Sequence, residues 1–292
     1  MSAAPARRPG PLRHALRVSG TGLCFLAGGL WLTGFAVLAF PIISLLTPDA
    51  QQRRLRVQRV LHHSLRTLMR LMHAVGLLSS EVRGREGLAK PGRLIVANHP
   101  TFIDAIYLLA QMPEVLCIAK GAIFSNPFTG PAARAAGYIS NAQDPGALIE
   151  QAAIALKSGH SLLIFPEGSR TRPGKPVHFA RGAAQIALTA HCPVVPVKIH
   201  CDPPALTKGQ WFWQIPRQVS HMCVTVQAEI QPDDFLRGGR ALPLAARDLN
   251  RVLLAACTGQ IIPAEDDAGA LHPAPMAHTC PKLRLPIKFL RT

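Results

Sequence analysis

Acidic residues are scarce in this chain, and they are almost missing from its first quarter. The 292 residues hold 16 Asp and Glu against 32 Lys and Arg, which gives a formal net charge of +16. Residues 1–70 contain ten arginines and one acid, Asp49, so this part alone carries a net charge of +9. Such a bias favours a polyanionic partner, which is either nucleic acid or an anionic membrane surface.

Charge of either sign is missing from residues 18–48, a mostly apolar run of 31 positions. About 20 apolar residues cross a bilayer core, so the run is long enough to span one with tilt or to fold back as a hairpin. It is too long for a signal peptide, and no small-x-small cleavage site follows it. Gly28, Gly29, Gly34 and Pro41 are points at which it can break into two helices. We therefore predict a membrane anchor, and both the single span and the re-entrant hairpin stay open.

Paired cysteines are missing as well, because the seven in the chain are scattered and form no C-x-x-C pair. This spacing indicates neither a disulfide framework nor a zinc site. We therefore predict no metal and expect the thiols to pack in the core of a protein from a reducing compartment. A G-x-S-x-G sequence is also missing, which argues against a serine hydrolase on an α/β fold. Since no zinc-finger or RNP-type motif occurs, the membrane rather than nucleic acid is the expected partner.

Residues 49–78 have the pattern of a basic amphipathic helix. Apolar residues recur there at spacings of three and four, and six arginines lie between positions 53 and 70. The apolar positions are Val57, Leu61, Leu65, Leu68, Met72 and Val75. This pattern is typical of a helix that lies in a lipid interface. The alternative is a helix that packs on its own domain and leaves its arginines in water.

Apolar runs of strand length alternate with helical patterns between residues 92 and 257. The strand candidates are 93–97, 115–119, 137–140, 161–166, 194–200 and 221–230, and the helical patterns cover 102–111, 146–158, 181–191 and 242–257. This alternation predicts an α/β fold with a mixed, largely parallel sheet flanked by helices, preceded by a membrane-embedded helical segment. The predicted divisions are a basic arm (1–17), the anchor (18–48), the interfacial helix (49–78), the α/β domain (79–257) and an irregular tail (258–292).

The stretch "VANHPTFIDA" (96–105) places His99 and Asp104 around the corner between a strand and a helix. Thr101 and Asp104 form a [ST]-x-x-[DE] start, so helix capping is one explanation of the acid. It does not explain His99, which lies at the carboxyl end of a strand, where α/β sheets bind ligands. A carboxylate in the first helical turn can accept the imidazole N–H and fix its tautomer.

A second stretch, "LLIFPEGSRTRPG" (162–174), is an apolar strand that ends in a turn with Glu167, Gly168, Ser169, Arg170 and Arg172. Arginine at such a corner suits a phosphate, which its planar fork binds through two hydrogen bonds. A solvated polar turn is the alternative for this segment taken alone.

Together, "NHPTFID" and "FPEGSRTRPG" resemble the glycerolipid acyltransferases, the 1-acylglycerol-3-phosphate acyltransferase family. The family's first motif is N-H-x-[S/T]-x-x-D and its third is F-P-E-G-[ST]-R. The resemblance extends through "AKGAIFSNPFTGPAARAAGYISN" (119–141), "HFARGAA" (178–184) and the "VVPV" block, and it covers roughly residues 90–230.

The resemblance implies a membrane-bound O-acyltransferase that moves an acyl group from a thioester of acyl carrier protein or coenzyme A to 1-acylglycerol-3-phosphate. His99 would be the general base, and Asp104 would orient it. The residues implied in substrate binding are Lys120, Glu167, Gly168, Ser169, Arg170 and Arg181. No metal or further cofactor is implied. With arginines on both flanks of the anchor, we expect the inner (plasma) membrane, with the catalytic domain on the cytoplasmic face.

Two positions depart from the family pattern. Pro100 replaces the commoner polar residue after the histidine, which we interpret as harmless, and the second block often ends in Ile-Asp-Arg, whereas this chain has "ISNAQD" (139–144). The missing arginine weakens the case for lysophosphatidate specifically as the acceptor. A related acyltransferase for another membrane lipid or pigment-lipid alcohol is therefore an alternative, and a membrane-anchored lipid-binding protein without activity is a lesser one.

Overall fold

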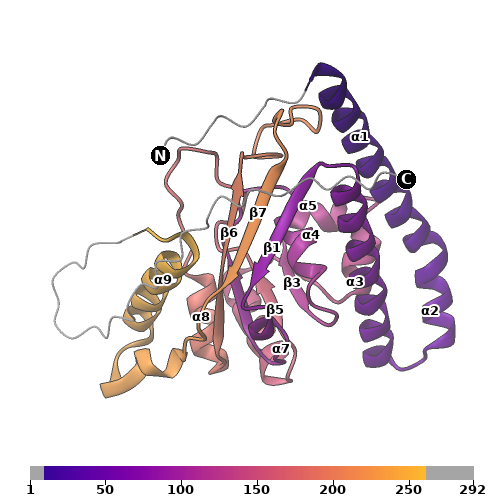
Figure 1. Cartoon of the computed structure of the whole chain (residues 1–292). Coiled ribbons are helices and arrows are strands. Elements are labelled where there is room, and N and C mark those ends of the chain that lie inside the picture. The colour runs from indigo at the N-terminus through magenta and orange to yellow at the C-terminus, as the bar shows by residue number, and fades with distance from the viewer. Residues whose placement is uncertain (1–9, 261–292) are drawn as a thin grey trace, which may run out of the picture. The chain divides into compact units, whose positions relative to one another are not determined.

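A seven-stranded sheet lies at the centre of residues 10–260, the part of the chain that the computed structural model describes (Figure 1). Its strands, in spatial order, are β1 (Leu78–Arg83), β7 (Ser220–Val226), β6 (Val194–Asp202), β2 (Leu94–Ala97), β5 (Leu162–Ile164), β3 (Leu116–Ala119) and β4 (Ile139–Ser140). The pairs from β6 to β4 are parallel, β7 is antiparallel to β6, and β1 is parallel to β7. The predicted mixed, largely parallel α/β sheet is confirmed.

The middle strands are short apolar runs that helices cover on both faces. All four residues of β2 are buried, and so are all three of β5, which is why the sequence shows them as uninterrupted apolar stretches. Strand β1 was not predicted, because only its first residue, Leu78, is buried and the rest is a polar edge. The carboxyl ends of β2, β5 and β6 share one edge of the sheet, since these strands run parallel.

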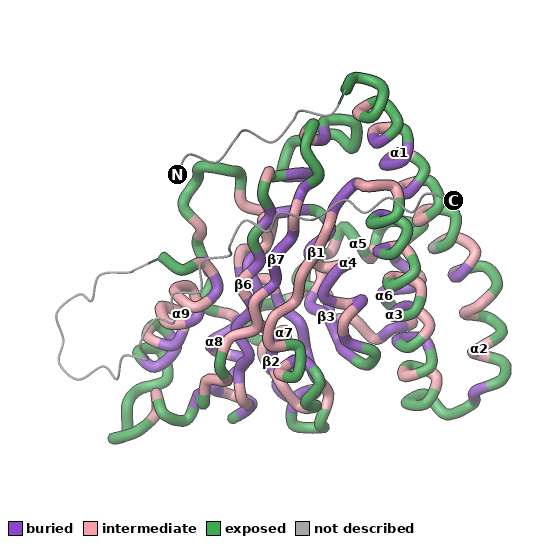
Figure 2. The backbone as a smooth tube through the Cα atoms, in the orientation of Figure 1, coloured by how far each residue is buried: buried purple, intermediate pink, exposed green. Residues whose placement is uncertain are grey.

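One face of the sheet is covered by α7 (Pro145–Lys157), α8 (Gly182–Ala190) and α9 (Leu242–Thr258), whose alanines and leucines share one buried cluster with β2, β3 and β5. The other face is covered by α4 (Asp104–Leu109) and α3 (Ala50–Ala74), which contribute to a second cluster. The burial map shows the middle strands largely buried between these layers, while the edge strand β1 is mostly half-buried (Figure 2). Short elements complete the fold: η2 (Arg85–Leu88), α5 (Gly121–Ser125), α6 (Gly130–Ala135) and η3 (Pro232–Gly239).

The segment predicted as the anchor forms α1 (Pro11–Gly34), the π-helical turn η1 (Phe35–Ala39) and α2 (Phe40–Leu46). Within residues 10–260, no single helix combines the length and the apolar character that crossing a membrane requires, so the single span, one of the two arrangements left open above, is not found. One side of the segment packs on α3, where Phe35 shares a buried cluster with Val57 and Leu61. The other side is exposed and apolar, at Leu12, Leu16, Leu23, Leu26, Leu30, Trp31, Val37, Leu38, Ile42, Leu45 and Leu46.

Helix α3 begins at the only acid of the first 70 residues, because the Asp49 side chain accepts a hydrogen bond from the Gln52 N–H at 2.7 Å. Its apolar side is covered by protein, with Val57, Leu61 and Met72 buried. This is the alternative arrangement considered for the amphipathic helix, and the exposed apolar surface belongs instead to α1 and α2. The N-terminal arm up to residue 9 and the predicted tail beyond residue 260 lie outside the described residues.

Candidate active site

Three segments meet at the carboxyl edge of the sheet because the strands before them are neighbours. His99 follows β2, Glu167 follows β5, and the connection from residue 203 to 219 follows β6. Since β2 lies between β5 and β6, the loop with His99 has one of the other segments on each side. This edge is where parallel α/β sheets carry their ligand sites.

His99 and Asp104 form a hydrogen-bonded pair, as the sequence predicts. The imidazole Nδ1 lies 2.9 Å from Asp104 Oδ2, and the Asp104 side chain is completely buried. The same carboxylate accepts the Thr101 N–H at 2.6 Å and the Thr101 hydroxyl at 2.5 Å. One carboxylate therefore fixes the helix start and the imidazole together, so capping does not exclude the catalytic role, which stays a prediction.

The environment of Asp104 determines which imidazole nitrogen is available. Burial raises the pKa of Asp104, whereas the hydrogen bonds from His99 and Thr101 act in the opposite direction. An ionised carboxylate only accepts hydrogen bonds, so Nδ1 carries the hydrogen and Nε2 keeps its lone pair. The imidazole also lies against Phe165, with ring centroids 4.4 Å apart, and its side chain is 18% exposed. This leaves the ring supported by protein and reachable from solvent.

Glu167 holds the backbone of the His99 loop. Its Oε1 accepts the His99 N–H at 2.6 Å, and its Oε2 accepts the hydroxyl of Thr171. Gly168 has φ of +65°, a left-handed conformation that favours glycine, and this turns the chain back after Glu167. The role of Glu167 in shaping the acceptor site stays a prediction, and the structure shows that this side chain fixes the backbone of His99.

Arg170 already has partners in this structure. Its Nη1 donates to the carbonyls of Leu206 and Thr207 at 3.2 and 3.4 Å, and its guanidinium lies 5.5 Å from the centroid of the Phe102 ring. Ser169 accepts a hydrogen bond from the Lys208 ammonium at 2.9 Å. The turn that the sequence associates with phosphate is therefore joined to the connection between β6 and β7.

The sequence did not reveal two contributors to this edge. Asn98 is buried, and its side chain exchanges two hydrogen bonds with the backbone of Ile199 on β6, at 2.9 and 2.7 Å. Lys208 belongs to a segment without a recognised motif. The place of Asn98 directly before His99 in the first motif was a signal that could have identified it. The sequence around Lys208 holds no such signal.

Lys120 and Arg181 are exposed and stand apart from this network. Lys120 precedes α5, directly after β3, and Arg181 precedes α8. Within the described residues, no hydrogen bond or ion pair joins either side chain to His99, Glu167 or Arg170. Their predicted part in substrate binding stays a prediction.

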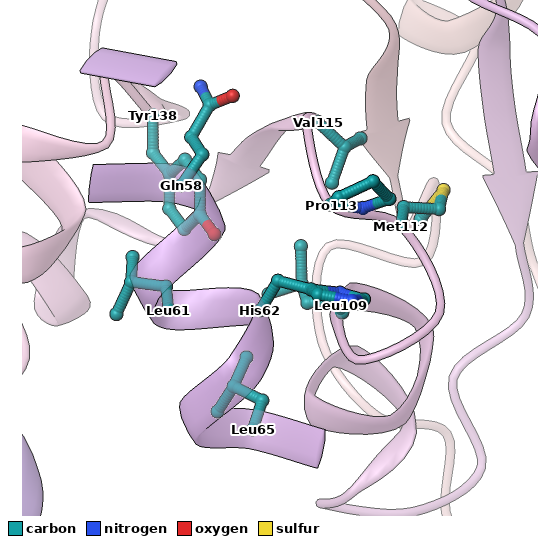
Figure 3. A pocket seen from close by; sticks show the side chains of 9 residues that line it. All are labelled: Gln58, Leu61, His62, Leu65, Leu109, Met112, Pro113, Val115 and Tyr138. Atoms are coloured by element: carbon teal, nitrogen blue, oxygen red, sulfur yellow. The ribbon is translucent and has the colours of Figure 1, made fainter. Parts of the chain in front are cut away.

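A separate small cavity lies between α3 and α4 and is lined by Gln58, Leu61, His62, Leu65, Leu109, Met112, Pro113, Val115 and Tyr138 (Figure 3). Its volume of about 10 Å³ is close to the minimum that holds one water molecule. None of the residues of the His99 network lines it. This cavity is therefore separate from the site around His99.

Among the described residues, the His99 hydrogen-bond network includes no cysteine and no group of side chains arranged to bind a metal ion. All six cysteines within residues 10–260 are buried, as expected for core residues, and Cys280 lies outside the described part. No cluster of three or more His, Cys, Asp or Glu side chains between residues 10 and 260 is arranged to hold a metal ion.

Comparison with known proteins agrees with the geometry. Residues 79–200 match the family model described as Acyltransferase. The chloroplastic 1-acyl-sn-glycerol-3-phosphate acyltransferase of Brassica napus is 27% identical over 196 residues, covering 64% of this chain and 55% of that protein. The alpha form of human 1-acyl-sn-glycerol-3-phosphate acyltransferase is 24% identical over 241 residues, covering 72% and 81%. The chain thus spans about half the length of the first of these relatives.

A solved structure shares the fold. The crystal structure of the 1-acyl-sn-glycerophosphate acyltransferase PlsC from Thermotoga maritima superposes with a TM-score of 0.61 at 21% identity. The superposition covers 83% of this chain and 95% of that one, so the similarity includes elements beyond the residues that the family model matches.

Proposed function

We propose that this chain, which is similar to the 1-acyl-sn-glycerol-3-phosphate acyltransferases, transfers an acyl group from a thioester donor to the hydroxyl of a membrane lysophospholipid. The acceptor that the relatives' names suggest is 1-acylglycerol-3-phosphate, which would give phosphatidate. The observation that carries the proposal is the His99–Asp104 pair, buried on the aspartate side and reachable on the imidazole side.

The geometry supports a single transfer step with His99 as general base. Asp104 holds the hydrogen of Nδ1, so Nε2 takes the proton of the acceptor hydroxyl as its oxygen attacks the thioester carbonyl. The new C–O bond forms, the C–S bond breaks, and the imidazolium returns the proton to the departing thiolate. A thioester is already activated, so the balance requires neither ATP nor a metal. Acyl carrier protein and coenzyme A are both suitable carriers for the donor.

We further propose that the exposed apolar side of α1 and α2 associates with the inner (plasma) membrane from the cytoplasmic side. Residues such as Leu30, Trp31 and Leu45 are 57–83% exposed, and contiguous apolar surface of this kind marks membrane or partner contacts. The arginines of the first 70 residues would add attraction to anionic lipids. A lipid acceptor would then be delivered in the plane of the bilayer.

The test is thiol release by the purified full-length chain in lipid vesicles, followed with and without an added lyso-acceptor, and with the acylated product identified by mass spectrometry. Release that depends on lysophosphatidate supports the proposal. Release without any acceptor indicates a thioesterase, and no release with any donor indicates a lipid-binding protein.

A second acceptor class is favoured by one observation. Nη1 of Arg170 is held by two backbone carbonyls, and the family's arginine after Ile139 is missing from this chain. Both facts reduce the number of cationic groups that are available to bind a phosphate of the acceptor. An acyltransferase for another membrane lipid or pigment-lipid alcohol would react equally well with a phosphate-free hydroxyl lipid in the same assay.

A further inference from the structure

The loop at residues 207–217, between β6 and β7, exposes three consecutive aromatic residues and is called the aromatic loop below. Trp211, Phe212 and Trp213 are 62%, 39% and 46% exposed. The two indoles stack with centroids 4.9 Å apart, and Phe212 meets Trp213 edge-on at 4.8 Å. Only 5% of the chain is aromatic, so three neighbouring exposed rings are a concentrated apolar surface that needs a partner.

The active site holds one end of the aromatic loop. Arg170 donates to the carbonyls of Leu206 and Thr207, and Lys208 donates to Ser169 in the neighbouring turn. The Leu206 carbonyl also accepts the N–H of Phe102, which follows His99 at the start of α4, at 2.9 Å. The beginning of the loop is therefore fixed to both motifs that carry the proposed chemistry.

Helix α1 holds the other end. Arg17 is only 8% exposed, and its guanidinium donates to the carbonyls of Pro216, Arg217 and Gln218, and to those of Gly76 and Leu77 after α3. Phe25 of α1 lies 6.0 Å from Phe212 and 5.7 Å from Phe102, measured between ring centroids. Figure 1 shows the loop beside the upper part of α1. The rings are thus held between the exposed apolar side of α1 and the His99 edge of the sheet.

The charge of the loop identifies its partner. Residues 203–219 contain no Asp or Glu, while Lys208 and Arg217 flank the three rings. Aromatic rings between cations suit the headgroup region of an anionic bilayer, where indoles are favoured and basic side chains meet lipid phosphates. The apolar surface also continues onto α1, through Phe25 to the exposed Leu23 and Leu26.

We propose that the aromatic loop inserts Trp211, Phe212 and Trp213 into the interface of an anionic bilayer and so holds the His99 edge of the sheet at the membrane surface. The inference rests on the proposed function, in that a membrane lipid is the acceptor. Arg17 is then a positioning residue that ties the loop to α1. The two arginines, Arg17 and Arg170, keep the loop at a fixed place between the membrane-facing helix and the base.

The chain's small number of tryptophans allows a direct test. It has three, and the exposed Trp31→Phe substitution leaves Trp211 and Trp213 as the only ones. We expect their fluorescence to shift to shorter wavelength on vesicles of phosphatidylcholine with phosphatidylglycerol. Lipids brominated near the headgroup end of the acyl chain should quench this tryptophan fluorescence. Acrylamide dissolved in the water should no longer quench it once the protein is bound to vesicles. Vesicle-bound protein whose loop tryptophans stay open to acrylamide and are not quenched by bromolipid overturns the inference.

A second measurement tests the contribution to binding. Trp211→Ser and Trp213→Ser should each weaken vesicle binding about tenfold, which corresponds to ~1.4 kcal/mol. The matched control is Ile154→Ser, an apolar residue on α7 that is 58% exposed, and it should leave vesicle affinity unchanged. If Trp211→Ser and Trp213→Ser bind vesicles as tightly as the control Ile154→Ser, the inference is contradicted. It is also contradicted by a tryptophan variant that keeps its vesicle affinity and loses affinity for the acyl donor's carrier, because the rings would then contact a protein.

These readouts separate the inference from the proposed function. Quenching and vesicle binding require no turnover, so a chain without transferase activity still gives a definite answer about the loop. Conversely, the protein can release thiol in an acceptor-dependent way while its loop tryptophans stay open to acrylamide. That result supports the proposed transferase function and contradicts the insertion of the aromatic loop into the bilayer.

Discussion

Asp104→Asn separates the chemistry of the site from its stability. Asp104 accepts three hydrogen bonds, from the His99 imidazole and from the N–H and hydroxyl of Thr101, while its side chain is fully buried. An amide has one acceptor oxygen, and its nitrogen only donates. Asp104 Oδ2 accepts both the Thr101 N–H and the imidazole N–H, so an amide oxygen in its place keeps both bonds, and the amide nitrogen lies beside the Thr101 hydroxyl. The tautomer of His99 is then kept, but the negative charge that stabilises the imidazolium formed during transfer is lost.

The expected loss of activity is large and the expected loss of stability is small. General base catalysis contributes roughly 10²–10⁴-fold, and loss of the charge that stabilises the imidazolium removes much of it. For stability, the altered bond with the Thr101 hydroxyl costs on the order of 1–3 kcal/mol, but the amide also removes the cost of a buried charge. Burial raises the pKa of Asp104, so ionising this carboxyl costs more in the folded state than in the unfolded chain. The resulting contribution to stability is present below the ordinary carboxyl pKa and is lost as pH rises through the raised one.

The variant should therefore be closest in stability to the parent at neutral and alkaline pH, and less stable than the parent in acid. The measurements are kcat/KM by acceptor-dependent thiol release and thermal unfolding from pH 4 to 8. Asp144→Asn is the matched control, because Asp144 also caps a helix, accepting the Ala147 N–H at 3.1 Å, away from any histidine. If Asp104→Asn keeps near-parental turnover, or if Asp144→Asn loses as much, the charge of Asp104 does not support the imidazolium and the reasoning fails.

Three further outcomes follow from the same contacts. His99→Ala should lower kcat/KM at least about 10²-fold while vesicle binding is unchanged, and full activity in the purified variant contradicts its role as base. Arg170→Ala should lower kcat/KM for a phosphate-bearing acceptor roughly 30–150-fold, and Arg170→Lys should restore only part, because an ammonium has no planar fork. An equal loss with a phosphate-free acceptor would assign Arg170 to holding Leu206 and Thr207 instead. Burial raises the pKa of Cys117 and of Cys257 to about 12, so neither should react with iodoacetamide at pH 8 until the protein unfolds, which peptide mass spectrometry checks.

The sequence predicted what short stretches determine by themselves. Strand β2 was predictable because Leu94, Ile95, Val96 and Ala97 are all buried and give an unbroken apolar run. The His99–Asp104 pair was predictable because both residues belong to one strand-to-helix corner. Strand β1 was not, since a polar edge strand with one buried residue has no such pattern.

Contacts between distant segments were beyond the sequence. Arg17 bonds to carbonyls about 60 and 200 positions further along the chain, and backbone carbonyls are the same whichever side chain a residue has. The uncharged run 18–48 indicated apolar surface without indicating that one side of it packs on α3. Likewise, the sequence around Arg170 does not indicate its bonds to Leu206 and Thr207, because those depend on where the chain goes after β6.

The strand order explains why these distant contacts meet at one histidine. Because β2 lies between β6 and β5, the Asn98–His99 corner is held from both sides: Asn98 bonds to Ile199 on β6, and the His99 N–H bonds to Glu167 after β5. The backbone is fixed by these two bonds, and Asp104 fixes the ring, so each bond that locates His99 uses an atom other than Nε2. Held in this way, His99 needs no reorganisation to take a proton at Nε2, as the proposed transfer to a hydroxyl requires.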